Sequence, residues 1–115
     1  NINAAEQELT DSVLNFYRKI IHLRKDSKYS DIIINGEFLP YESEDPCVIA
    51  YQRNASNGRL LVIHNFQNCQ STIKLPKKDM EVIIGNYPEN YNQNIIVHDF
   101  YKLLPYECIT LYMNS

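Results

Sequence analysis

The sequence has no tryptophan and only three glycines among its 115 residues. The glycines stand alone, so the chain has no glycine-rich loop for cradling phosphates. No apolar run approaches the ~20 residues that a membrane-spanning helix requires. The net charge of −3 is spread along the chain, without the basic cluster that nucleic-acid binding needs. We therefore expect no nucleic acid and no membrane among the partners.

Cysteine is also sparse, and no two cysteines have the spacing of a zinc or redox motif. We expect free thiols, with Cys47 and Cys108 packed as small apolar groups because both lie in apolar stretches. Cys69 is the third. Reduced thiols, and a start at residues 1–6 without the pattern of a signal peptide, favour a cytoplasmic location.

Nothing in the sequence assembles into a recognisable active site, so we expect no catalysis, no metal and no cofactor for this chain. His22 falls on a polar helix face, and His64 beside an apolar run favours a hydrogen-bonded structural role. His98 and Asp99 would point to opposite faces of a strand, which argues against a general base and its partner. Glu107 differs from the other acids, because it lies against a closing apolar run and needs partners there.

One amphipathic helix is predicted over residues 12–25, after a loosely ordered lead-in at residues 1–9. Thr10 and Asp11 are good N-cap residues, and no Gly or Pro interrupts the segment. The apolar arc covers about half the helix, wider than the ~100° stripe that one contact surface needs, which indicates burial between two bodies. Arg24 projects into this arc, either with its stem packed and its head in water or pinned by an acceptor. The apolar positions are Val13, Leu14, Phe16, Tyr17, Ile20, Ile21 and Leu23.

The rest of the chain is typical of short strands separated by turns. Nine tyrosines and many β-branched residues favour pleated surface. We expect a mainly β fold: an antiparallel Greek-key β-sandwich of about seven or eight strands, preceded by the helix. Asn35-Gly36 predicts a hairpin turn, and Pro40 an edge strand. The predicted strands are 32–34, 37–41, 48–53, 60–63, 71–75, 80–84, 95–97 and 107–112.

A binding function is the alternative to a purely structural one. Tyr87, Tyr91 and Tyr101 surround an Asn-rich loop, and tyrosine faces can stack on sugar rings. Ordinary packing at the sandwich edge explains the same tyrosines, and we prefer that interpretation. Oligosaccharide is therefore a secondary expectation for a partner.

Six segments of the chain follow a known set of motifs in order and at sensible spacing. They are Tyr17–Lys25, Asn35–Phe38, Val48–Arg53, Leu61–Phe66, Ile84–Tyr87 and Leu103–Cys108. Each motif is weak by itself, but together the six resemble the end of α-amylase-family enzymes of the oligo-1,6-glucosidase branch. Cys108 replaces a small residue of the family pattern, and Leu104 a polar one.

This resemblance implies that residues 1–26 hold the last helix of a catalytic barrel and residues 27–115 the C-terminal β-sandwich. The family's catalytic carboxylates lie upstream of the matching segment, so none is assigned here. The wide apolar arc is then covered by the sandwich on one side and by the barrel on the other. Arg24, Tyr17, Tyr106 and Glu107 are expected to have structural or interdomain roles.

The function we expect is therefore that of a non-catalytic C-terminal domain of a retaining α-glucosidase acting on short oligosaccharides. Its partner would be the catalytic barrel of the same polypeptide. A sugar-binding module that uses the loop tyrosines is one alternative. An oligomerisation domain is the other, because an uncovered barrel-facing surface would favour self-association.

Overall fold

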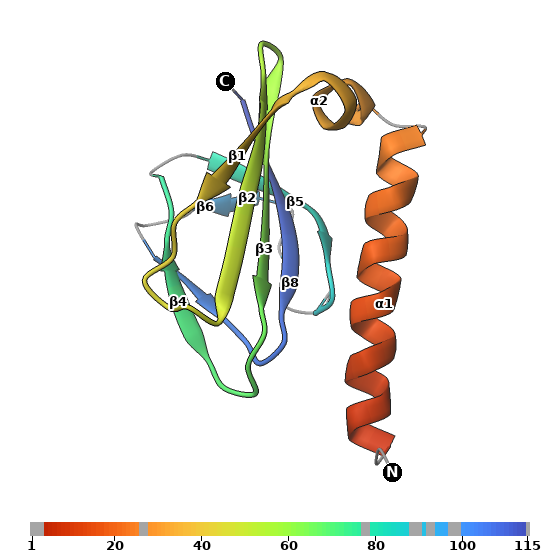
Figure 1. Cartoon of the computed structure of the whole chain (residues 1–115), viewed down its shortest axis with the longest axis vertical. Coiled ribbons are helices and arrows are strands. Elements are labelled where there is room, and N and C mark those ends of the chain that lie inside the picture. Colours follow the sequence, from red (N-terminus) through yellow and green to blue (C-terminus); the bar gives the residue numbers. More distant parts are fainter. Residues whose placement is uncertain are drawn as a thin grey trace.

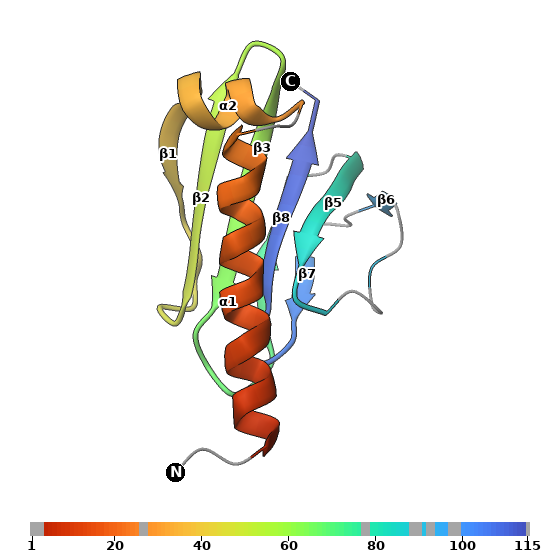
Figure 2. The ribbon, with the colours of Figure 1, turned by 90° about the vertical axis from the view of Figure 1, so that its right-hand side faces the viewer.

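The computed structural model describes residues 4–25, 28–76, 79–87, 91, 94–96 and 100–114. The fold is mainly β, as the sequence predicts, with two antiparallel sheets and one long helix laid over the larger sheet (Figures 1 and 2). The helices are α1 (Ala4–Lys25) and α2 (Ser30–Asn35). The strands are β1 (Glu37–Tyr41), β2 (Val48–Ala55), β3 (Gly58–Asn65), β4 (Ser71–Lys74), β5 (Asp79–Gly85), β6 (Asn94–Ile96), β7 (Phe100–Leu103) and β8 (Cys108–Met113).

The larger sheet has the strand order β1-β2-β3-β8-β5-β6, and the smaller sheet pairs β4 with β7. The β1, β2 and β3 strands form a meander, with β1 at the edge as Pro40 predicts. After β5 the chain passes through β6 and β7, and then returns as β8 to lie beside β5. This return is a Greek-key connection.

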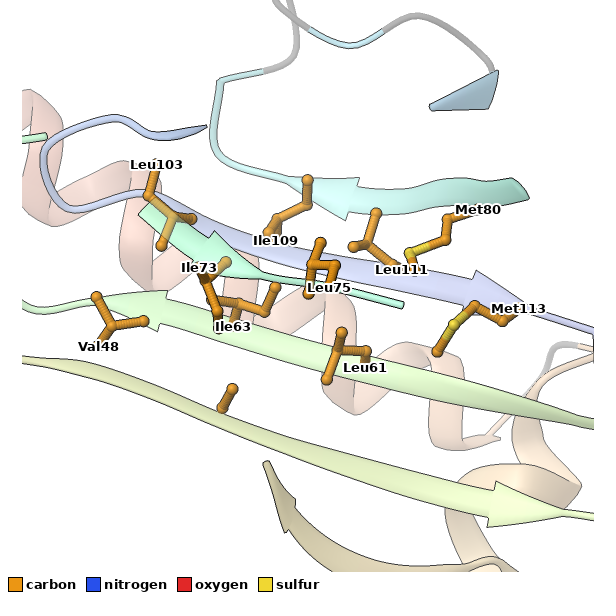
Figure 3. Close-up of a cluster of buried hydrophobic side chains, with 11 residues drawn as sticks. Val48, Leu61, Ile63, Ile73, Leu75, Met80, Leu103, Ile109, Leu111 and Met113 are labelled. Carbon is orange, nitrogen blue, oxygen red and sulfur yellow. The ribbon is translucent and has the colours of Figure 1, made fainter. Parts of the chain in front are cut away.

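The larger sheet is covered on both faces. The small sheet covers one face, and side chains of both sheets form the main core (Figure 3). Helix α1 covers the other face, where Phe16 packs against Val62, Ile84 and Cys108. Strand β3 is therefore buried on both sides, which explains its continuous apolar sequence. The main core consists of Val48, Ala50, Leu61, Ile63, Ile73, Leu75, Met80, Leu103, Ile109, Leu111 and Met113.

Helix α1 begins two turns before the predicted start. Residues 4–9 belong to the helix, so the expectation of a loosely ordered lead-in is wrong for them. This stretch consists of good helix formers, and Gln7 Nε2 donates to Asp11 Oδ1 at 3.0 Å, one turn away. Asp11 lies inside the helix, where its carboxylate accepts this bond instead of capping an end.

Residues 32–34 belong to α2, so the predicted strand and hairpin are wrong. Tyr29 and Ile32 are buried against Leu60 of β3, a contact that uses one face of a helical turn. The Gly36 N–H donates to the Ile32 carbonyl at 2.9 Å and ends the helix. A Cβ at Gly36 would overlap that carbonyl, so the glycine is required by close approach rather than by a hairpin turn.

One further expectation is wrong, one strand was not predicted, and two expectations fall outside the described residues. Cys47 is exposed rather than packed in the core, since it lies in the turn before β2. Strand β7 was not predicted, because Phe100–Leu103 alternates over only four residues. His98 lies outside the described residues, as does the proposed domain boundary between residues 26 and 27.

Candidate functional site

A buried carboxyl group organises the end of the sandwich where the β5–β6 loop meets β7 and β8. Glu107 is 0% exposed, and both of its oxygens accept hydrogen bonds. The hydroxyls of Tyr91 and Tyr101 donate to Oε2 at 2.8 and 2.7 Å, and the Leu104 N–H donates to Oε1 at 2.8 Å. The partners that the sequence requires for Glu107 are therefore present. They come from two parts of the chain, the loop after β5 and the strand β7 with the residue that follows it.

The hydroxyls of Tyr91 and Tyr101 keep their protons and so remain hydrogen-bond donors to Glu107. Burial, and then the adjacent Glu107 carboxylate, raise the pKa of Tyr91 and of Tyr101 above the usual value of a phenol. Both hydroxyls therefore stay protonated at neutral pH. The ring of Tyr91 lies where a side chain at residue 85 would project, so Gly85 allows the approach.

Asn86, directly after β5, forms hydrogen bonds to the segment around the start of β8. Its Oδ1 accepts from the Cys108 N–H at 2.7 Å, and its Nδ2 donates to the Tyr106 carbonyl at 2.9 Å. The same Nδ2 lies 3.4 Å from Ser12 Oγ of α1. Asn86 thus links the β5 end, the turn before β8 and the long helix through one side chain.

The turn before β8 contains Tyr106 and is contacted by Tyr87, which follows β5. Tyr106 adopts a positive φ of 54°, which is uncommon for a residue with a Cβ, and its N–H donates to the Gln67 carbonyl at 3.1 Å. The Tyr87 hydroxyl donates to the Pro105 carbonyl at 2.6 Å. Tyr87 and Tyr106 therefore serve the backbone of this turn.

The predicted sugar-binding tyrosines are thus close together, and their hydroxyls have protein partners. Tyr91 and Tyr101 meet at Glu107, and the Tyr87 N–H donates to the Tyr91 hydroxyl at 3.2 Å. Packing explains these contacts. Sugar binding by the three tyrosines stays a prediction.

Two asparagines, Asn65 and the partly buried Asn86, were missed as structural residues by sequence reasoning. Asn65 is 0% exposed, and its Nδ2 donates to the carbonyls of Cys69 and Leu104, both at 3.0 Å. Asn86 makes the links described above. Both lie inside segments that carry the family resemblance, and an amide directly after an apolar run was the available signal.

A second constellation joins α1 to the larger sheet. The Tyr17 hydroxyl lies 2.7 Å from Nδ1 of His64 on β3, and the His64 ring stacks on Phe66 with 3.6 Å between centroids. Burial lowers the pKa of His64 to about 4 and raises the pKa of Tyr17 to about 12. At neutral pH an uncharged imidazole therefore faces a protonated phenol, a matched acceptor and donor.

The apolar arc of α1 is divided between two faces. Val13, Phe16, Ile20 and Leu23 pack against the sheet, whereas a second stripe of the helix stays exposed. The exposed stripe of the helix is continuous with exposed apolar residues of the sheet, and His64 connects them. The His64 ring contacts Tyr17 of the helix and stacks on Phe66. His64 also pairs with Ile49 in the β2–β3 register. We name this surface the outer patch. It consists of Leu14 (51% exposed), Tyr17 (37%), Ile21 (58%), Ile49 (57%) and Phe66 (51%).

Arg24 follows Ile21 by three residues and lies on the same side of the helix as this stripe. Its side chain is exposed in the last turn. The choice between a solvated head and a pinned guanidinium for Arg24 stays a prediction. His22, as predicted, is exposed.

None of the described helices is long and apolar enough to cross a membrane. Within the same part of the chain, no three His, Cys, Asp or Glu side chains come together as metal ligands would.

The two packed antiparallel sheets, with α1 on the outer face of the larger one, define the class of the protein as a β-sandwich domain with a helix on one face. Residues 48–109 match the family model described as the alpha-amylase SusG C-terminal domain. This match covers more than half of the chain, so the chain belongs to that family.

Curated relatives extend the likeness beyond residues 48–109. The probable oligo-1,6-glucosidase 2 of Bacillus subtilis is 35% identical over 107 residues, which cover 93% of this chain and 18% of that protein. The trehalose-6-phosphate hydrolase of the same organism is 39% identical over 74 residues, covering 63% and 13%. This chain therefore spans less than a fifth of the length of these relatives.

Solved structures show the same arrangement. The crystal structure of trehalose-6-phosphate hydrolase from Bacillus licheniformis superimposes with a TM-score of 0.68 at 28% identity, covering 86% of this chain and 18% of that one. The chain thus matches the C-terminal domain of α-glucosidase-type enzymes, as its sequence motifs imply.

Proposed function

We propose that this chain is the structural C-terminal part of a longer retaining α-glucosidase, and that α1 packs between its own sandwich and the catalytic barrel. The outer patch carries this proposal. A helix that had only to cover one sheet would need only the stripe around Phe16, yet Leu14, Tyr17 and Ile21 extend apolar surface away from the sheet. The relatives are several times longer than this chain, and the part of such a protein that lies outside this chain would cover the outer patch.

The outer patch is large enough to matter energetically. Fully burying a large apolar side chain stabilises by roughly 1.5–3 kcal/mol, and each of the five residues is between one-third and two-thirds exposed. Covering all five would then contribute roughly 5 kcal/mol before the cost of ordering. A contribution of this size is comparable to the stability of a whole domain.

The chemistry of the longer protein follows from the same resemblance. It would hydrolyse terminal α-linked glucose from short oligosaccharides with retention, using two carboxyl groups that flank the scissile bond. Those groups would come from the barrel, and this chain would contribute no catalytic residue. A cytoplasmic location and a role in carbohydrate metabolism belong to the same proposal.

The test compares this chain with the longer polypeptide encoded by its reading frame. We expect the longer protein to hydrolyse a chromogenic α-glucoside and this chain alone to be inactive. Ile21→Asp should lower the thermal midpoint of the longer protein but leave that of the chain within about 1 °C, because Ile21 is exposed in the chain alone.

The control is Ile34→Asp, since Ile34 is equally exposed at 56% but lies on α2. Ile34→Asp should affect neither protein. Hydrolysis by this chain would refute the non-catalytic role, and equal effects of the two substitutions in the longer protein would refute docking through the outer patch.

Self-association is a second candidate, favoured by the same exposed side chains. Sedimentation of this chain at rising concentration would show a dimer that Ile21→Asp dissociates. A monomer over the whole concentration range would rule this candidate out and leave docking on the barrel unaffected.

A further inference from the structure

An open cleft lies where the edge of the larger sheet meets the small sheet, far in sequence from the Glu107 cluster. Its volume is about 510 Å³, and its lining comes from the segment that ends β1 and the segment that ends β4. The Tyr41 hydroxyl donates to the Lys74 carbonyl at 2.6 Å, which joins the two segments. Among the described residues, the lining consists of Tyr41, Glu42, Ser43, Glu44, Lys74, Leu75 and Pro76.

The walls of this cleft combine apolar surface with positively and negatively charged side chains that can form hydrogen bonds with hydroxyl groups. Tyr41 packs on the main core, so its ring has a fixed position. Glu42 and Glu44 supply acceptors, and Lys74 supplies donors. Opposite charges in one small cleft suit a neutral ligand with many hydroxyls better than an ion, because a ligand of either sign would face a like charge.

An exposed aromatic residue, Phe100, is the strand partner of Lys74, one of the residues that line the cleft. Phe100 pairs with Lys74 in the β4–β7 register, so the two side chains lie side by side on the outward face of the small sheet. Phe100 is 62% exposed, whereas Leu103 of the same strand is fully buried. An aromatic face next to polar groups is the arrangement on which the apolar face of a pyranose ring stacks.

We propose that the cleft and Phe100 form a saccharide-binding subsite for a neutral α-linked glucose oligosaccharide. One sugar ring stacks on Phe100, and its hydroxyls are bound by Lys74 and Glu44. The choice of a glucose oligosaccharide rests on the proposed function, since a domain of an α-glucosidase meets such chains. The subsite lies on the small sheet, whereas the outer patch lies on the opposite side of the larger sheet, so docking on the barrel leaves it open.

The experiment is a titration of this chain with maltotriose and, separately, with isomaltotriose, followed by NMR chemical-shift changes at millimolar concentrations. We expect saturable binding of at least one trisaccharide. Phe100→Ala and Glu44→Gln should each weaken it about tenfold, the loss expected for one stacking contact or one hydrogen bond to a charged group. Both positions are exposed, so the variants should keep the urea midpoint of the parent chain.

Phe38→Ala is the matched control, because Phe38 is a second exposed phenylalanine (53%) on a strand of the larger sheet. It should leave the affinity unchanged. The proposal is overturned if neither trisaccharide binds, or if binding survives both Phe100→Ala and Glu44→Gln. It is also overturned if only Tyr91→Phe or Tyr101→Phe abolishes binding, since the site would then be the loop tyrosines. None of these outcomes affects the hydrolysis test of the proposed function.

Discussion

The hydroxyl of Tyr17 lies 2.7 Å from Nδ1 of His64 and joins the long helix to the most buried strand. The His64 side chain is 7% exposed, and burial lowers its pKa to about 4 from a usual 6.5. The unfolded chain therefore binds a proton at His64 between pH 6.5 and 4, where the folded chain does not. Stability contributed by the neutral ring is present above pH 6.5 and is lost as the pH falls through this window.

We accordingly predict that the free energy of unfolding falls by about 1–2 kcal/mol from pH 6.5 to pH 4 through His64 alone, a figure reduced to allow for solvent screening. Urea titrations at a series of pH values would measure it. His64→Gln keeps an acceptor for Tyr17 but cannot take up a proton, so its pH dependence in this window should be shallower by that amount. Equal slopes for the two proteins would contradict the prediction.

Removing the charge of Glu107 should destabilise the sandwich. In Glu107→Gln an NH2 group replaces one of the two carboxylate oxygens. A buried tyrosine hydroxyl or the Leu104 N–H then faces a second donor and loses its acceptor. We expect a loss of about 2 kcal/mol in urea unfolding, as for a hydrogen bond to a charged group. Glu37→Gln, at an exposed position of β1, is the control and should change stability by less than about 0.5 kcal/mol.

Tyr91 and Tyr101 share one oxygen of Glu107, so their contributions should be coupled. Tyr91→Phe and Tyr101→Phe should each cost about 1.5 kcal/mol, because each leaves Oε2 with one donor. The double variant should cost more than the sum by at least about 0.5 kcal/mol, since Oε2 then loses both. A double-mutant cycle in urea would measure this, and strict additivity would show that the two bonds are independent.

The three thiols should differ sharply in reactivity. Cys47 and Cys69 are exposed, whereas Cys108 is buried and burial raises its pKa to about 12. A thiol reagent at pH 8 should therefore label two cysteines rapidly and the third only when the chain unfolds. Cys47→Ser and Cys69→Ser should each remove one rapid equivalent, and Cys108→Ala should leave both. Three equally rapid equivalents would contradict the described burial of Cys108.

Local pattern alone determined several parts of this protein. The 3.6-residue period predicted a helix, and continuous apolar residues predicted the central strand β3. Alternation correctly assigned Ile109, Leu111 and Met113 to one face of β8 and Cys108, Thr110 and Tyr112 to the other. The width of the apolar arc on α1 predicted apolar surface beyond the contact with the sheet, and Leu14 and Ile21 are exposed there. Each of these depends on side chains a few residues apart, so the sequence carries the information directly.

Tertiary contacts decided the rest. Ile32 lies in a helical turn because Tyr29 and Leu60 bury it there, although three consecutive isoleucines favour a strand. Glu107 was expected to have partners, but one of them, Tyr91, reaches it only after the loop beyond β5 meets β7 and β8. Cys47 and Cys108 have similar apolar neighbours in sequence, yet one lies in a turn and the other under α1. Burial and hydrogen bonding join residues far apart in the chain, so no local window contains them.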